Sequence, residues 1–285
     1  MRWVGVVLLV AVLLGCSGGA AVEGTEVAVE TSTTEAEAET TDAAVETTEA
    51  AGESNPAETG EPWDLVWFSD STGWGVADLW AERLAEELGV EVRVHDYAAG
   101  NLSAGLIRTW IETEGSVHRE SVAEAEVIVI FGNPIGSGAT SDIGTCVSTS
   151  TAPRDPPQNY TAEDFLPYRD VLVSIWETVF DLRKGQPTIV RAIDMYNPVI
   201  ADHREAGIEA ECIAAWEAFS QTIREAAAEF GVPTASMFDA FNGPNHDEDP
   251  REKGFIGSDK QHTTDQGKAA MVEVLHGLGY DPTNP

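Results

Sequence analysis

Four short polar segments of the sequence together hold the residue types needed for nucleophilic acyl transfer. Ser71 supplies a hydroxyl, His262 an imidazole that can take its proton, and Asp259 a carboxylate that can orient the ring. The backbone N–H groups of Ser71 and Gly100 and the side-chain amide of Asn133 are candidate donors to a developing oxyanion. Each residue type is common by itself, so the hypothesis depends on the four segments occurring together.

Each segment also has a structural interpretation. Ser71 is suited to cap a helix, because a serine hydroxyl can accept hydrogen bonds from the first helical N–H groups. Asn133 precedes Pro134 and fits a turn, while Asp259 and His262 also fit a solvated loop. The remaining histidines show no spacing typical of metal ligands. The serine mechanism requires neither a metal nor an organic cofactor, so we expect none.

The elements that would position these segments alternate between strand-like and helix-like patterns. Short apolar runs predict strands at 64–68, 90–94, 127–131, 188–193 and 234–238. Helical spacing of apolar residues predicts helices at 77–88, 102–114, 162–184, 210–230 and 264–278. Such alternation predicts a parallel sheet flanked by helices, and the carboxyl ends of its strands share one edge. The irregular stretch 135–160 is long enough to predict a functional loop.

The four segments resemble the blocks that define the SGNH hydrolase superfamily, also called GDSL-type esterases and lipases. The blocks follow the family's order, and together they span nearly all of the domain. They are Phe68-Ser69-Asp70-Ser71-Thr72, Tyr97-Ala98-Ala99-Gly100-Asn101, Phe131-Gly132-Asn133 and Asp259-Lys260-Gln261-His262. The resemblance implies a flavodoxin-like, three-layer α/β/α domain with about five parallel strands. It also implies Ser71 as nucleophile, His262 and Asp259 as its partners, and Gly100 and Asn133 as oxyanion donors.

Two positions depart from the family's pattern. Ser69 stands where the family usually has glycine, which we expect to shift the turn before Ser71 slightly. Gly132 directly precedes Asn133, and Pro134 follows where the family usually has aspartate. The asparagine itself is present, so we expect a different loop shape rather than a loss of activity.

Trp74 lies three residues after the candidate nucleophile. An aromatic residue in this place can wall an acyl or sugar pocket, or it can simply pack into the core. The sequence leaves both interpretations open.

The N-terminus is typical of an exported protein. An apolar run from residue 3 to 15 has the length of a signal-peptide core, and Leu13-Leu14-Gly15-Cys16 resembles a lipobox. We therefore expect a signal peptide over 1–15 and a lipid anchor on Cys16 that holds the protein at the outer side of the cell membrane. An ordinary signal peptide is the alternative.

Residues 16–62 predict a disordered tether before a folded domain at 63–285. Residues 17–62 contain twelve acidic residues, no basic residue and no aromatic residue. Such a segment cannot bury enough apolar surface to offset the entropy of ordering it.

Charge and cysteine content limit the possible partners. The chain has 49 acidic and 16 basic residues, and its formal charge of −33 argues against binding nucleic acid. With Cys16 lipidated, Cys146 and Cys212 remain, and two cysteines in an exported domain predict a disulfide. Two unpaired thiols are the alternative, and the sequence does not indicate an oligomeric state.

These observations predict a membrane-anchored serine ester hydrolase acting on a small-molecule or glycan ester. Tethering at the surface favours short acyl groups, such as those of O-acetylated glycans. A lysophospholipase or lipase activity is the alternative within the same chemistry. Two further hypotheses are an inactive glycan-binding lipoprotein with the same fold and a structural or adhesion lipoprotein, which would have no reactive serine.

Overall fold

The computed structural model describes residues 60–133, 146 and 162–283 of the chain. The predicted signal peptide, Cys16 and almost all of the predicted tether lie outside the described residues, and so does the loop 135–160 apart from Cys146. The lipid anchor and the tether therefore stay predictions.

A five-stranded parallel sheet forms the centre of the domain, in the order β2-β1-β3-β4-β5. Its strands are β1 (Trp63–Phe68), β2 (Val92–Asp96), β3 (Val127–Ile130), β4 (Ile189–Ile193) and β5 (Thr234–Ala235). Every residue of β3 and β4 is buried, which explains why these strands have nearly continuous apolar sequences. The strand order is that of flavodoxin-like folds.

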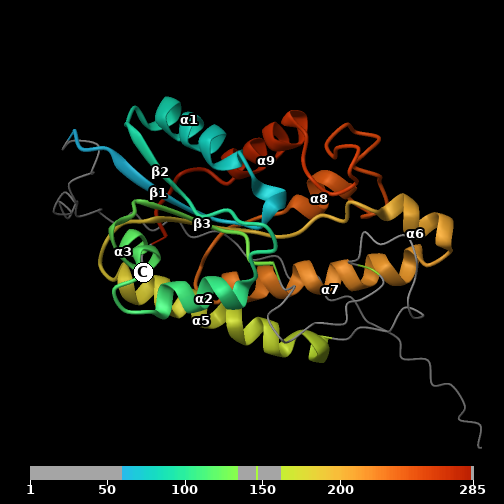
Figure 1. Ribbon diagram of the computed structural model, residues 1–285, viewed down its shortest axis with the longest axis horizontal. Helices are drawn as coiled ribbons and strands as arrows, with labels where there is room; N and C mark the ends of the chain where they lie inside the picture. The colour runs from blue at the N-terminus through green and yellow to red at the C-terminus, as the bar shows by residue number, and fades with distance from the viewer. Residues whose placement is uncertain (1–59, 134–145, 147–161, 284–285) are drawn as a thin grey trace, which may run out of the picture. The chain divides into compact units, whose positions relative to one another are not determined.

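Helices cover both faces of the sheet (Figure 1). On one face lie α1 (Val76–Leu88), α8 (Met237–Asn242) and α9 (Asp265–Gly277), and on the other lie α2 (Ala104–Glu112), α3 (Val117–Glu124), α5 (Leu166–Leu182) and α7 (Glu209–Ala228). The short helix α6 (Ile200–Ala206) packs against α7. The described residues also include the 3₁₀ turns η2 (Ser71–Gly73) and η3 (Ala162–Phe165). This arrangement confirms the predicted three-layer α/β/α fold. None of the described helices is long and apolar enough to cross a membrane.

Side-chain caps fix where several helices begin. The hydroxyls of Ser103, Ser116 and Thr264 accept hydrogen bonds from the first-turn N–H groups of α2, α3 and α9. Gly89 ends α1 in the left-handed conformation, with a φ of 67°. The caps of α2 and α9 lie in segments at the carboxyl edge of the sheet, whereas Gly89 ends α1 on the side where β2 begins.

The last strand is shorter than predicted. The apolar run predicted a strand to residue 238, but β5 ends at Ala235 and α8 begins two residues later. Ser236 caps α8, and the buried Asp194 carboxylate accepts the N–H groups of Met237 and Phe238. Both caps favour a helix over a longer strand. The helices α3, α6 and α8 are short and were not predicted.

Cys146 and Cys212 form a disulfide, with their Cα atoms 5.1 Å apart. Both residues are fully buried, and the Cys146 carbonyl accepts a hydrogen bond from the Trp216 indole at 2.9 Å. The bond ties Cys146 to α7, which packs on the sheet.

Reduction of this disulfide is expected to destabilise the domain by about 4 kcal/mol, because the two cysteines are 66 residues apart and the closed loop restricts the unfolded chain. Denaturant unfolding with and without a reductant measures the change. A Cys146→Ser/Cys212→Ser double variant should show the same loss and no further response to the reductant. An unchanged unfolding midpoint after complete reduction would contradict this expectation.

Candidate active site

Ser71 lies directly after β1, at the carboxyl edge of the sheet, and it opens the 3₁₀ turn η2. Asp70 is the residue that caps this turn, since its side chain accepts the Thr72 N–H at 2.9 Å. The helix α1 begins only at Val76, after Gly75, so Ser71 caps neither this helix nor the turn η2. With the cap supplied by Asp70, the Ser71 hydroxyl is available for another partner.

The turn before Ser71 accommodates the unusual serine at position 69. Ser69 Oγ accepts the Trp67 indole N–H at 2.9 Å, and a Cβ placed on Gly73 would lie 2.5 Å from the same oxygen. The Ser69 side chain thus occupies the space that Gly73 leaves open. A serine at 69 and a glycine at 73 therefore fit together in this turn.

Three predicted residues come together although they lie up to 191 positions apart in the sequence. His262 Nε2 lies 3.0 Å from Ser71 Oγ, and His262 Nδ1 lies 2.7 Å from Asp259 Oδ2. The Ser71 side of this array is buried, whereas the His262 and Asp259 side chains are partly exposed. The hydroxyl, imidazole and carboxylate therefore form a continuous chain of contacts that reaches solvent.

Backbone hydrogen bonds shape the loop that carries His262. Asp259 Oδ1 accepts the N–H groups of Gln261 and His262, each at 3.0 Å. Lys260, between Asp259 and Gln261, has a φ of 63°, a left-handed conformation that turns the chain sharply. This local turn brings the Asp259 carboxylate back to the imidazole three residues later.

The pKa of Asp259 lies below its ordinary value. Partial burial acts to raise the pKa, but the hydrogen bonds from the Gln261 N–H and from the ring and N–H of His262 outweigh it. The carboxylate is consequently ionised at neutral pH, as a group that orients an imidazole must be.

Two side chains that the sequence analysis missed connect this loop to the rest of the edge. The Tyr196 hydroxyl donates to the Gln261 carbonyl at 3.0 Å, and the Thr263 hydroxyl donates to the Thr72 carbonyl at 3.2 Å. Tyr196 follows β4 by three residues, so its place after a parallel strand was the available signal. Thr263 simply adjoins His262, and the sequence holds no sign of its partner.

Asn133 follows β3 and reaches the same edge. Its Nδ2 donates to Asp70 Oδ2, next to Ser71, and its carbonyl accepts the Ala104 N–H at 2.7 Å. Pro134 lies outside the described residues, so the turn expected there stays a prediction. The amide nitrogen carries two hydrogens, and the bond to Asp70 sets the orientation of both.

Gly100 lies in the segment after β2, which runs beside the Ser71 segment. The Tyr97 N–H donates to the Trp67 carbonyl at 2.9 Å, and the Ala99 N–H donates to the Ser69 carbonyl at 3.1 Å. These bonds extend the pairing of β1 and β2 beyond the strands and bring Gly100 toward the nucleophile turn. Gly100 is exposed.

Other charged side chains near the strand ends have structural partners. The pKa of the buried Asp194 is raised to about 6 by burial, against the hydrogen bonds from Phe238, Arg224 and Met237 that act to lower it. His246 lies between Asp239 and Glu217, at 2.7 Å from each. Within the described residues, no group of three or more histidine, cysteine or acidic side chains could hold a metal ion.

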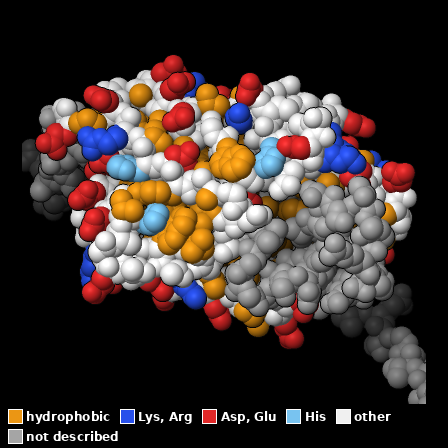
Figure 2. Space-filling model, in the orientation of Figure 1, with side chains coloured by type: hydrophobic (Ala, Val, Ile, Leu, Met, Phe, Trp, Pro, Cys, Tyr) orange, Lys and Arg blue, Asp and Glu red, His pale blue; other side chains and the backbone are white. Residues whose placement is uncertain are grey.

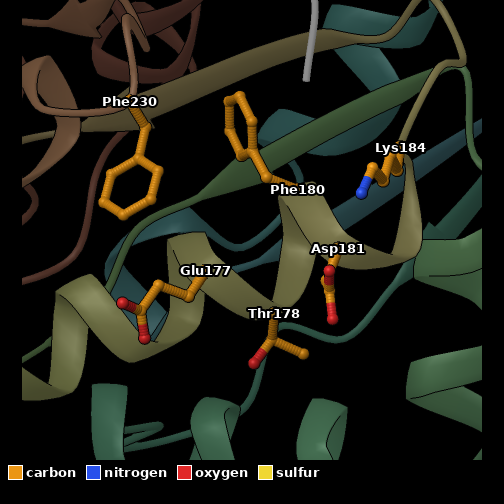
Figure 3. A pocket seen from close by; sticks show the side chains of 6 residues that line it. All are labelled: Glu177, Thr178, Phe180, Asp181, Lys184 and Phe230. Carbon is orange, nitrogen blue, oxygen red and sulfur yellow. The ribbon is translucent and has the colours of Figure 1, made fainter.

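An open pocket of about 560 Å³ lies elsewhere on the domain (Figure 3). It is lined by the last turns of α5 and by Phe230, just after α7: Glu177, Thr178, Phe180, Asp181, Lys184 and Phe230. Both helices end where the chain returns to the amino ends of β4 and β5, which is the edge opposite Ser71. This pocket is therefore separate from the candidate active site.

Comparison of the structure with solved proteins supports the fold. A lipase named Lip_vut3 from a goat rumen metagenome has a TM-score of 0.56 and 18% identity, over 77% of this chain and 98% of that protein. TesA has a TM-score of 0.47 and 15% identity, over 75% of this chain and 96% of that protein. The esterase EstA from Pseudoalteromonas sp. has a TM-score of 0.46 and 8% identity, over 76% of this chain and 96% of that protein. No protein-family model and no curated protein matches the sequence.

Proposed function

We propose that the domain is a serine ester hydrolase that works through an acyl-enzyme. The observation that carries the proposal is the chain of contacts from Ser71 Oγ to His262 Nε2, at 3.0 Å, and from His262 Nδ1 to Asp259, at 2.7 Å. Both distances are within the range for proton transfer between a nucleophile, a base and its orienting group. The fold, which is shared with a lipase, agrees with this chemistry.

The proposed reaction has two steps. Ser71 Oγ attacks the ester carbonyl carbon while His262 Nε2 takes the hydroxyl proton, and the tetrahedral intermediate then loses the alcohol, which receives that proton. Water attacks the acyl-Ser71 carbonyl in the second step while His262 takes its proton. The bond to Ser71 Oγ then breaks, His262 returns the proton to that oxygen, and the acid is released. Asp259 stays ionised and stabilises the imidazolium in both steps.

The oxyanion donors in this proposal are the backbone N–H groups of Ser71 and Gly100 and the side-chain amide of Asn133. The bond from Asn133 to Asp70 supports this role, because it fixes the amide beside the nucleophile turn before substrate arrives. The hydrogen bonds of the Gly100 segment to the Ser71 segment support it in the same way.

We further propose short acyl esters as substrates, of which O-acetylated glycans are one class. The partly exposed His262 and Asp259 side chains support this, since bulky alcohol groups could reach them from solvent. A disulfide between buried cysteines is typical of oxidising compartments and agrees with an exported domain.

A fluorophosphonate probe tests the proposal directly. The reagent should attach to the Ser71 oxygen with loss of fluoride, because it reacts with serines activated by a neighbouring base. Mass spectrometry of the labelled peptide should place the adduct on Ser71 in the wild type. In a His262→Gln variant, labelling should slow by about 100-fold or more.

A heat-denatured sample serves as the control for unspecific reaction. The inactive glycan-binding alternative predicts no labelling of the folded protein. An adduct on another residue, or equal labelling of wild type and His262→Gln, would rule out the proposed nucleophile and base.

A further inference from the structure

Trp74 is a large apolar side chain three residues after the proposed nucleophile, and it is not part of the core. Its side chain is 48% exposed, whereas Trp67 and Trp80, on either side of it in the sequence, are fully buried. Trp74 ends the turn η2, and its N–H donates to the Ser71 carbonyl at 3.4 Å. Burial in the core, one of the two interpretations of this residue, is thereby excluded.

The indole lies against the proposed base. The ring centroids of Trp74 and His262 are 5.5 Å apart, and the two planes differ by 6°, so the rings are stacked. Figure 2 shows apolar side chains beside histidines on one face of the molecule. The described tryptophan–histidine stacks are this pair and Trp110–His118 on α2 and α3.

The other end of the indole approaches the segment of the proposed oxyanion donor. A Cβ placed on Gly100 would lie 3.9 Å from Trp74 Cζ2, which is ordinary van der Waals contact. The ring thus extends from the imidazole toward Gly100. It presents a flat apolar surface beside the imidazole of His262 and beside Gly100.

The chemistry of the leaving group decides which part of an ester meets this surface. For His262 to protonate the departing alcohol, the alcohol oxygen must come within about 3 Å of Nε2. The atoms bonded to that oxygen then lie beside the imidazole and the indole stacked on it. The acyl carbon, by contrast, is held at Ser71 Oγ.

We infer that Trp74 binds the alcohol part of the substrate through its exposed face, and that this part is a sugar ring. This inference rests on the proposed function and names its substrate class. The C–H face of a pyranose is flat and apolar and matches an indole, while its hydroxyls point to the rim. The strong excess of acidic over basic residues in the chain agrees with a neutral sugar rather than a phosphorylated alcohol.

The test keeps the acyl group constant and varies the alcohol. Acetate release from ethyl acetate and from β-D-glucose pentaacetate is measured for wild type, Trp74→Ala and Trp74→Phe. In Trp74→Ala, kcat/KM for the sugar acetate should fall by about 10-fold, mainly through KM, and for ethyl acetate by less than about 3-fold. Trp74→Phe, which keeps a flat ring, should recover much of the loss.

Trp110→Ala is the matched control, because Trp110 is also partly exposed and stacked on a histidine. Its kinetics should equal those of the wild type. Equal losses on both acetates through kcat would overturn the inference, since Trp74 would then only hold His262. A loss that grows with acyl length in p-nitrophenyl acetate, butyrate and octanoate would also overturn it. Failure of the proposed function is distinguishable, because the wild type would then hydrolyse no ester and react with no fluorophosphonate.

Discussion

Replacing Ser71 with alanine is expected to lower kcat for p-nitrophenyl acetate and butyrate by at least about 10⁴-fold, because the acyl-enzyme then cannot form. The two hydroxyl side chains nearest to Ser71 in the sequence are held by other hydrogen bonds. Ser69 Oγ accepts the Trp67 indole N–H, and the Thr72 hydroxyl donates to Asp70. The initial rates of ester hydrolysis at equal protein concentration measure the change.

Ser69→Ala is the matched control, a change of the same size two residues earlier. It leaves the buried Trp67 N–H without its acceptor, which should reduce the free energy of unfolding by about 1–2 kcal/mol. Its effect on kcat should stay within about 3-fold, because Ser69 makes no contact with His262 in the triad geometry. Ser71→Ala should show the opposite pattern, with normal stability and almost no activity. Equal rates for Ser71→Ala and the wild type would remove the assignment.

Of these two serines, only Ser71 could be given a role in the proposed site from the sequence. Ser71, His262 and Asp259 could be predicted because all follow strands of a parallel sheet, whose carboxyl ends must share one edge. The motif order added which serine and which histidine to choose. The alternation of strand-like and helix-like segments in the sequence predicted a parallel sheet of about five strands, and the structure confirms it.

The contacts that refine the site were not predictable in this way. The Ser69 side chain fills the space beside Gly73, and the Asn133 side-chain amide donates a hydrogen bond to the Asp70 carboxylate. The Tyr196 hydroxyl donates a hydrogen bond to the Gln261 carbonyl. Each depends on the three-dimensional position of a side chain whose partner has no fixed spacing in sequence. The early end of β5 has the same origin, because Asp194, the residue after β4, accepts the first N–H groups of α8.

Asp259→Asn is expected to lower kcat by about 10³-fold or more while leaving the fold intact. In the wild type the carboxylate accepts the Nδ1 proton of His262, which leaves Nε2 unprotonated toward Ser71. An asparagine would keep its oxygen on the N–H groups of Gln261 and His262 and present its NH₂ group to Nδ1. The imidazole proton would then move to Nε2, which could no longer accept the Ser71 proton.

The pH dependence separates this explanation from a general loss of structure. Because its hydrogen bonds lower the pKa of Asp259 despite partial burial, the carboxylate is ionised throughout about pH 5–9. Over this range the ionisation of Asp259 should therefore add no pH dependence of its own to the kcat of the wild type. Because folding lowers the pKa of Asp259, the ionised carboxylate stabilises the fold at any pH above the pKa that this group has in the unfolded chain. That contribution disappears as the pH falls through the folded-state value, so the two proteins should converge in stability only in acid.

Asp265→Asn provides the matched control for this loop. Asp265 begins α9, is fully exposed, and pairs only with Lys268 among the described ion pairs. The same aspartate-to-asparagine change six residues away should leave kcat and its pH profile unchanged. If Asp259→Asn kept kcat within about tenfold of the wild type, the carboxylate would not be needed to set the tautomer. The pairing of His262 with Asp259 would then be a feature of loop structure, and Ser71 and His262 would have to act as a dyad.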